Sequence, residues 1–408
     1  MDNQKYYIIV SVAFFTSLFA LKLLYPLAIR LRLVDRPNSR KQHSGEIPLI
    51  GGVAMFIGFC AGLILILPDI TNMISGVFFA SLIIVTIGIL DDYSEISVSL
   101  RFIAQIASVL VMIYSGLQIS DLGNLLGVGV FSLGYFSLPF TIIAAVGVIN
   151  ALNMIDGVDG LAGATAIVCF ISVLFLYYLS GQMNIIPLIF TAVLVPFLWR
   201  NMRSKKKIFM GDAGSMFLGL GLVWSVISAS QGEDAVMKPV TALWILAIPL
   251  MDTIVTMLRR MMHGQSPFSP DREHLHHILI KIGFNNKETL HIMTLITIIF
   301  SLIGVLGQAF NVPEWVMFYA FIILCFTYLF LVHRIWLGIK LIKLNEPELA
   351  ATVNIPKLDT KGDDSSEVYE ACVVCGKLTY ELKSTHIDYR DRYVIGVGQV
   401  CGNCRLKK

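Results

Sequence analysis

Charged side chains are scarce in this chain. Of its 408 residues, 14% are charged and 56% are hydrophobic, and the mean hydropathy is +0.74. Soluble proteins usually carry about 25% charged residues, so this composition excludes a soluble globular protein of this length. The net charge of +3 gives no indication of a nucleic-acid partner, and we expect none.

Lysine and arginine are nearly absent from every second loop. Apolar stretches, about eleven of them and each long enough for a span, lie near 6–26, 49–67, 73–90, 102–118, 135–152, 161–180, 185–199, 213–229, 240–257, 290–309 and 314–333. The alternate loops contain one lysine, Lys238, and no arginine, whereas the segments after the first, seventh, ninth and eleventh stretches each carry several lysines and arginines. The positive-inside rule therefore predicts an all-α polytopic membrane protein of about eleven transmembrane helices, with the N-terminus outside and the C-terminus in the cytosol.

Two further absences narrow the class of protein. The first apolar stretch lacks a small-residue cleavage site, so we expect it to be a span and not a cleaved signal peptide. No internal repeat of the transporter kind is present, which argues against a secondary transporter.

Carboxylates stand where a membrane chain least tolerates them. Asp91 and Asp92 follow one apolar stretch, Asp156 and Asp159 follow another in NMIDGVDG, and Asp212 precedes a third in FMGDAGS. Acidic groups beside spans mark functional sites by default. All five fall on the predicted cytosolic side, so we expect one shared metal site there, since Mg²⁺ prefers carboxylate oxygens and substrate phosphates. For each motif alone, the alternative is ordinary helix-end decoration or an N-cap.

Small and polar neighbours accompany these acids. Asn153 lies three residues before Asp156, and the two share a face if the helix continues that far. Gly211 and Ser215 flank Asp212 at an expected helix N-terminus, where backbone N–H groups favour a phosphate.

Two polar loops carry further candidate substrate-binding residues. They are Lys41, His43, Arg272, His274, His276 and His277. Their cations and imidazoles suit phosphate binding on a cytosolic loop. The alternatives are solvated loops that only set topology and, for HLHH, a zinc site.

The tail differs in composition from the rest. We divide the chain into a membrane domain at 1–344, a polar linker at 345–370 and a module at 371–408 with strand-like stretches near 378–382 and 393–400. Cys372, Cys375, Cys401 and Cys404 have the spacing C-x₂-C-x₂₅-C-x₂-C, which is typical of a four-cysteine zinc site. In the reducing cytosol this favours structural Zn²⁺ over disulfides. Cys60, Cys169 and Cys325 lie in apolar stretches and are expected in the core.

Taken in order, the segments DRPNSRKQH, IPLIGG, DDYSEIS, NALNMIDGVDG, FMGDAGS, PVTALWILAIPLMDT and SPFSPDREHLHH resemble the polyprenyl-phosphate N-acetylhexosamine-1-phosphate transferases. The resemblance runs from about residue 30 to about 335 and is strongest to the undecaprenyl-phosphate branch that uses UDP-N-acetylglucosamine. The tail has no counterpart in the family pattern.

The resemblance implies transfer of N-acetylglucosamine 1-phosphate from UDP-N-acetylglucosamine to undecaprenyl phosphate at the cytosolic face of a bacterial inner membrane, as a first step of O-antigen or related polysaccharide synthesis. It implies Mg²⁺ or Mn²⁺ on Asp212 with Asp91 and Asp92 nearby, either of which would accept the acceptor's proton. It places Asn153, Asp156 and Asp159 at the nucleotide and metal, and the loop of Arg272 with the three histidines at the sugar or its phosphates.

Several alternatives stay open at this point. The donor could be another UDP-sugar, including the phospho-muramoyl-pentapeptide, or the acids could serve a cation-coupled transporter. Direct attack competes with a double displacement through an aspartyl-phosphate. The sequence does not decide between a monomer and a homodimer, nor whether the tail has a protein partner.

Overall fold

The computed structural model describes residues 3–36, 45–66, 71–203, 206–262, 264, 266, 274–344, 369–372, 378–382, 393–394 and 398–399. It divides into two compact units, of which the first comprises Met1–Asp35 and Glu46–Cys325 and the second Arg36–Gly45 and Phe326–Lys408.

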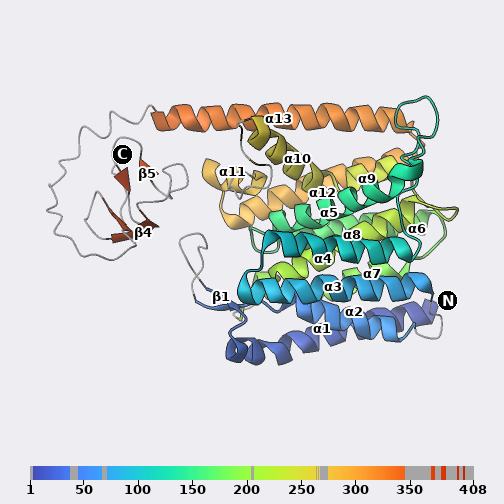
Figure 1. Ribbon diagram of the computed structural model, residues 1–408, viewed down its shortest axis with the longest axis horizontal. Helices are drawn as coiled ribbons and strands as arrows, with labels where there is room; N and C mark the ends of the chain where they lie inside the picture. The colour runs from blue at the N-terminus through green and yellow to red at the C-terminus, as the bar shows by residue number, and fades with distance from the viewer. Residues whose placement is uncertain are drawn as a thin grey trace. The chain divides into compact units, whose positions relative to one another are not determined.

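The first unit is a bundle of helices that run side by side (Figure 1). The helices are α1 (Asn3–Leu31), α2 (Gly51–Ile64), α3 (Asn72–Ser94), α4 (Val98–Tyr114), η2 (Gly134–Phe136), α5 (Ser137–Ile155), α6 (Leu161–Leu179), α7 (Ile185–Arg203), α8 (Gly211–Ser230), α9 (Pro239–Ile245), α10 (Ala247–Met262), α11 (Leu275–Ile282), α12 (Asn286–Ala309) and α13 (Glu314–Leu344), the last of which continues into the second unit.

Within the described residues, eight helices are long and apolar enough to cross a membrane. The pair α9 and α10 meets the same test jointly but is bent by 79°, and α2 and α4 are shorter apolar helices. The protein is therefore an all-α polytopic membrane protein. Each predicted apolar stretch falls on a helix, but the stretch 240–257 is broken.

The break between α9 and α10 has a local cause. Pro249 has no backbone N–H, so the carbonyl of Ile245, four residues earlier, cannot receive its helical hydrogen bond. Instead that carbonyl accepts from Cys169 Sγ at 3.1 Å and Ser301 Oγ at 3.4 Å. Neighbouring helices thus satisfy a backbone group that lipid could not.

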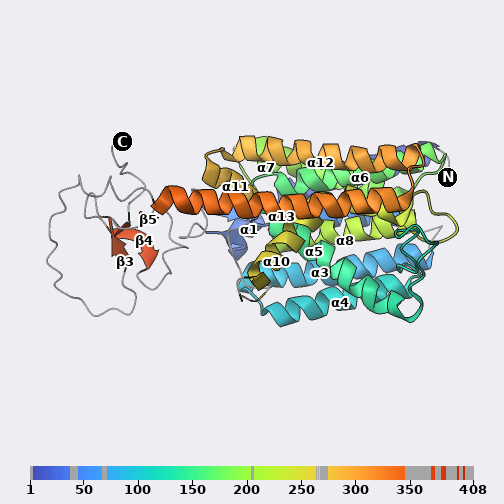
Figure 2. The same ribbon diagram turned by 90° about the horizontal axis from the view of Figure 1, so that it is seen from above.

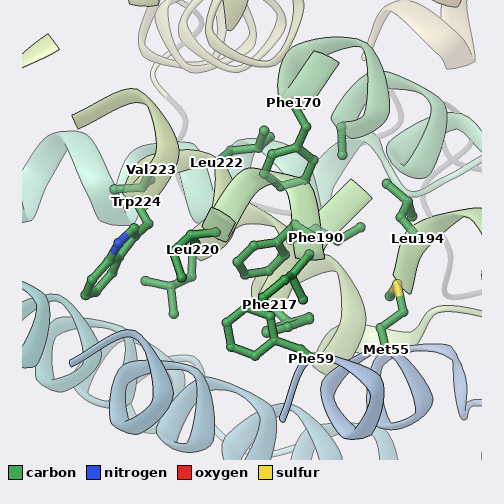
Figure 3. Close-up of a cluster of buried hydrophobic side chains, with 14 of the residues drawn as sticks. Met55, Phe59, Phe170, Phe190, Leu194, Phe217, Leu220, Leu222, Val223 and Trp224 are labelled. Carbon is green, nitrogen blue, oxygen red and sulfur yellow. The ribbon is translucent and has the colours of Figure 1, made fainter. Parts of the chain in front are cut away.

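Helix α8 forms the centre of the bundle. In the most apolar part of α8, 89% of the residues are buried, whereas the corresponding figure for α13 is 17%. Helix α8 is surrounded by α2, α3, α5, α6 and α7 (Figure 1; Figure 2). Figure 3 shows the core beside it, where Phe190 lies between Phe170, at 5.3 Å between ring centroids, and Phe217, at 4.7 Å. Burial of these large rings stabilises the position of α8.

Glycines bring two helices against the first turn of α8. A Cβ on Gly52 of α2 would collide with the backbone of Gly214, and one on Gly88 of α3 would collide with the backbone of Ala213. Small residues allow such close backbone approach between membrane helices. The N-terminus of α8 is therefore fixed between α2 and α3.

Short extended segments fix the entry to α8. Strand β1 (Val34–Asp35) pairs antiparallel with β2 (Ile47–Pro48), and beyond β2 the N–H groups of Gly51 and Gly52 donate to the carbonyls of Phe209 and Met210, each at 3.0 Å.

In the second unit, β3 (Tyr369–Ala371) pairs antiparallel with β4 (Leu378–Leu382), and β5 (Tyr393–Val394) pairs with β6 (Gly398–Gln399). Cys372 follows β3 and is buried. Strand β4 confirms the predicted stretch 378–382. Cys375, Cys401 and Cys404 lie outside the described residues.

Candidate active site

The ends of α3 and α5 and the starts of α8 and α11 lie at the same end of the bundle, opposite the N-terminus (Figure 1). This end carries most of the candidate residues: Asp91, Asp92, Asn153, Asp156, Asp159, Gly211, Asp212, Ser215, His274, His276 and His277. Lys41, His43 and Arg272 lie outside the described residues.

Asp92, in the last turn of α3, caps helix α8. Its Oδ1 accepts from the backbone N–H of Asp212 at 2.7 Å, and its Oδ2 accepts from that of Ala213 at 3.2 Å. The N-cap residue of α8, Met210, makes no side-chain cap of its own. A carboxylate from another helix therefore satisfies the N–H groups that a helix start leaves free, and its charge suits the helix dipole.

Gly211 is required by this cap. Its φ is +71°, which favours glycine, and a Cβ at this position would collide with the Asp92 carboxylate. The N–H groups of Asp212 and Ala213 at this helix start thus donate to a carboxylate of the protein itself.

Asp91 holds the turn between α3 and α4. Its buried carboxylate pairs with Arg101 at 2.6 Å and accepts from the backbone N–H of Ile96 at 3.1 Å. The same carboxyl group also lies within hydrogen-bond reach of the Asp212 carboxyl group. Asp91 therefore joins the turn to the acidic centre and carries one neutralising cation.

Asn153 and Ser215 orient Asp212. Asn153 Nδ2 donates to Asp212 Oδ1 at 2.6 Å and to Ser215 Oγ at 2.8 Å, while Ser215 Oγ reaches the Gly211 carbonyl at 3.2 Å. These bonds connect the end of α5 to the start of α8. They fix the Asp212 carboxylate through its Oδ1.

The loop after α5 carries the remaining acids. Helix α5 ends at Ile155, so Asn153 and Asp156 do not continue on one helical face. Asp159 pairs with Lys207 at 2.5 Å, whereas Asp156 is exposed to solvent. The carboxyl groups of Asp212 and Asp159 lie close enough to Asp156 for their charges to interact with it.

The histidine cluster is fixed by an acid that the sequence analysis did not single out. Asp252 on α10 is buried, its Oδ2 lies 2.9 Å from His274 Nδ1, and its Oδ1 accepts from the backbone N–H of Leu275 at 2.8 Å. The signal was available, because Asp252 is another lone carboxylate within an apolar stretch.

His276 joins this cluster to the loop after α5. Its ring is stacked on that of His274 with centroids 6.0 Å apart, and the ring of His277 lies 4.1 Å away. A Cβ on Gly157, the neighbour of Asp156, would collide with His276 Nε2. Burial lowers the pKa of His276 to about 4, so the ring is neutral at pH 7.

A divalent cation fits the chemistry of the acidic centre. Among the described residues, no three His, Cys, Asp or Glu side chains form a complete metal cage. Mg²⁺ seldom needs one, because it is commonly held by one or two carboxylates together with substrate phosphates and water. Asp212, beside Asp91 and near Asp156, offers such oxygens, and it forms no ion pair with the lysines and arginines that the structure describes.

Comparison with known proteins gives the family. Residues 73–230 match the model of glycosyl transferase family 4. The chain is 38% identical over 323 residues to the undecaprenyl-phosphate alpha-N-acetylglucosaminyl 1-phosphate transferase of Yersinia pestis, an alignment that covers 78% of this chain and 88% of the relative. The chain therefore belongs to the same family as this relative, glycosyl transferase family 4. The protein of the same name from Escherichia coli K12 is 37% identical, in an alignment that covers 82% of this chain and 93% of the relative. The protein of that name from Haemophilus influenzae is 38% identical, and the alignment covers 80% of this chain and 94% of the relative.

The family 4 match begins in α3 and ends with α8. It therefore contains the whole acidic centre, from Asp91 to Ser215. The histidine cluster and the cysteine tail lie beyond it.

Proposed function

We propose that this family 4 transferase moves N-acetylglucosamine 1-phosphate from UDP-N-acetylglucosamine to undecaprenyl phosphate. An oxygen of the acceptor phosphate bonds to the β-phosphorus of the donor, the bond from that phosphorus to the bridging oxygen breaks, and UMP leaves. The observation that carries the proposal is the convergence of Asp91, Asp92, Asp156 and Asp212 with Asn153 at one end of the bundle, in a chain that resembles transferases of this name over most of its length.

Charge is the main obstacle to this reaction, since two phosphates must meet beside several carboxylates. We assign Asp212, with Asp156 or Asp91, to hold Mg²⁺ or Mn²⁺, which when bound supplies positive charge to the phosphates. Asn153 and Ser215 fix the Asp212 carboxylate, and Asp92 fixes the helix start from which it projects. Catalysis then rests on positioning and electrostatics.

Proton transfer contributes less. A phosphate monoester has a second pKa of about 6 and is mostly dianionic at neutral pH. Asp91 or Asp92 would take the remaining proton, but their bonds to Arg101 and to the start of α8 favour a framework role. Direct attack therefore accounts for the reaction without an aspartyl-phosphate.

We propose that the polar residues around the centre bind the substrates' charged parts. Lys207 pairs with Asp159, and His276 of the histidine cluster lies against Gly157, the neighbour of Asp156. Lys41, His43 and Arg272 are assigned to the phosphates from the sequence.

We further propose that the site faces the cytosol of a bacterial inner membrane. The count then reaches about eleven spans when α2, α4 and the broken α9–α10 pair each cross once. Two basic segments, 200–207 and 259–272, support this orientation, because they lead into α8 and α11, whose starts carry the site.

The donor sugar is the part of the proposal most open to competition. A sibling transferase for another UDP-sugar or for the phospho-muramoyl-pentapeptide would use the same acidic centre. Membranes that contain the protein, given undecaprenyl phosphate and each labelled donor in turn, are expected to form organic-extractable label from UDP-N-acetylglucosamine at least tenfold faster than from UDP-N-acetylgalactosamine or the muramoyl donor. Faster transfer from another donor would keep the chemistry and change the branch. Transfer from none, in folded protein, would favour a transporter.

For the tail we propose one structural Zn²⁺ held by Cys372, Cys375, Cys401 and Cys404. The buried Cys372 at the end of β3, beside the β3–β4 hairpin, supports this assignment. A closed Cys₄ site would stabilise a module too small for a hydrophobic core.

A further inference from the structure

A buried carboxylate outside the acidic centre connects α10 to the histidine cluster. Asp252 is 2% exposed, and His274, to which it bonds, is 5% exposed. A buried charge is costly unless it is paired and fully hydrogen-bonded. Both oxygens of Asp252 are used, one by the His274 ring and one by the Leu275 N–H, so the pair meets that condition.

The bond to Nδ1 determines where His274 carries its proton. An ionised carboxylate only accepts hydrogen bonds, so the ring must carry hydrogen on Nδ1. In the neutral ring Nε2 is then an acceptor, and in the charged ring it is a donor. Asp252 thus selects which ring nitrogen of a neutral His274 carries the proton.

The hydrogen bond from the Leu275 N–H to Asp252 fixes the start of α11, which carries the histidine cluster. His274 is the N-cap of α11 but makes no side-chain cap, and Asp252 supplies that cap from another helix. From His274 the contacts run to the stacked ring of His276 and on to Gly157, beside Asp156. One carboxylate therefore fixes both the orientation of α11 and the side of the acidic centre that α11 faces.

We propose that Asp252 is a positioning residue for phosphoryl transfer, which acts by holding His274 in its Nδ1-protonated form at the edge of the acidic centre. This rests on the proposed transferase function. The effect reaches the acidic centre through α11, whose His276 ring is stacked on His274 and lies against Gly157, the neighbour of Asp156.

Asp252→Asn separates this role from simple helix capping. Asparagine keeps the size and one oxygen, which still accepts from Leu275, but it presents an amide N–H₂ to His274 Nδ1. The ring must then move its proton to Nε2 or lose the bond. By comparison with outer carboxylates that orient metal-bound histidines, we expect kcat for lipid-linked product to fall about 10- to 100-fold. Thermal stability should change little.

Two readouts distinguish positioning from structure. In protein labelled with ¹⁵N-histidine, the His274 signal, identified by its absence in His274→Gln, should report a protonated Nδ1 in the wild type and an unprotonated Nδ1 in Asp252→Asn. The double variant should lose no more activity than His274→Gln alone, because Asp252 acts through that ring. Thr253→Val is the matched control. Thr253 is the next residue on α10, and its hydroxyl has no hydrogen-bond partner among the described residues.

Three results would overturn the proposal: an unprotonated Nδ1 in wild-type His274, kcat within twofold of wild type in Asp252→Asn, or additive losses in the double variant. If Asp252→Asn does not fold, Asp252→Glu replaces it and should keep Nδ1 protonated, and the wild-type spectrum remains decisive. A wild-type protein that forms no lipid-linked product would refute the transferase function instead, and the spectra would still test the Asp252–His274 pair.

Discussion

At the residue scale, two carboxylates at this end of the bundle accept hydrogen bonds from the backbone of a distant helix. Asp92 caps α8 and Asp252 caps α11, each from a different helix. The sequence located Asp92 through its place after an apolar stretch, but its partners are 120 and 121 residues away in the chain. Long-range caps of this kind have no sequence signature, because capping patterns are local.

His276 gives a prediction about pH. Its folded pKa of about 4 lies below the ordinary 6.5 because the ring is buried. The unfolded chain therefore binds a proton first, so the contribution of this ring to stability is complete above pH 6.5 and is lost as pH falls from 6.5 toward 4. We expect the thermal midpoint of the purified protein to decrease through this window.

His276→Gln tests that assignment, since glutamine is polar and of similar size but does not titrate. The dependence of its thermal midpoint on pH between 6.5 and 4 should be shallower than that of the wild type. Equal slopes in the two proteins would mean that other groups control the acid sensitivity.

At the element scale, the site depends on how closely α2 and α3 approach the first turn of α8. Gly88→Ala would place a methyl group against the Ala213 backbone, and overpacking of this kind usually costs about 1–3 kcal/mol. The displaced turn carries Asp212, so we expect both a lower thermal midpoint and at least tenfold less transfer activity.

Gly147→Ala on α5 is the matched control for Gly88→Ala. A Cβ at Gly147 meets nothing within 4 Å, and alanine favours the helix by about 1 kcal/mol relative to glycine. Its activity and midpoint should equal or exceed those of the wild type. A normal Gly88→Ala enzyme would show that α8 tolerates displacement.

The helices themselves were predictable, since long apolar stretches have few other structures in a membrane. The break at Leu246 could not be predicted from the sequence, because Pro249 lies in the first turn of α10, where proline is tolerated. The carbonyl of Ile245 that Pro249 leaves unbonded accepts hydrogen bonds from side chains on α6 and α12, which only the tertiary structure brings together. The acidic clusters could be assigned to one end of the bundle from topology, but the bonds among Asn153, Ser215 and Asp212 depend on side-chain geometry.

At the scale of the whole molecule, the tail is the part that the family does not explain. Purified full-length protein is expected to contain one equivalent of zinc by elemental analysis, and Cys401→Ser with Cys404→Ser should remove it. Cys169→Ser is the control, because that thiol lies in the core of the bundle. Less than a tenth of an equivalent in the wild type would exclude a structural zinc site.

The central claim is that Asp212 is the charged centre of a lipid-linked sugar-phosphate transferase. Asp212→Asn keeps the acceptor oxygen for Asn153 and the cap from Asp92 but removes the charge. Asp121→Asn, at a loop acid that bonds to the Gly123 N–H, is the control for loss of a carboxylate.

The most direct measurement is organic-extractable label formed from labelled UDP-N-acetylglucosamine and undecaprenyl phosphate, with and without Mg²⁺, by the wild type and both variants. We predict metal-dependent product from the wild type and from Asp121→Asn, and a loss of at least 100-fold in folded Asp212→Asn. Product that forms equally well in Asp212→Asn, or without any divalent metal, would contradict the account.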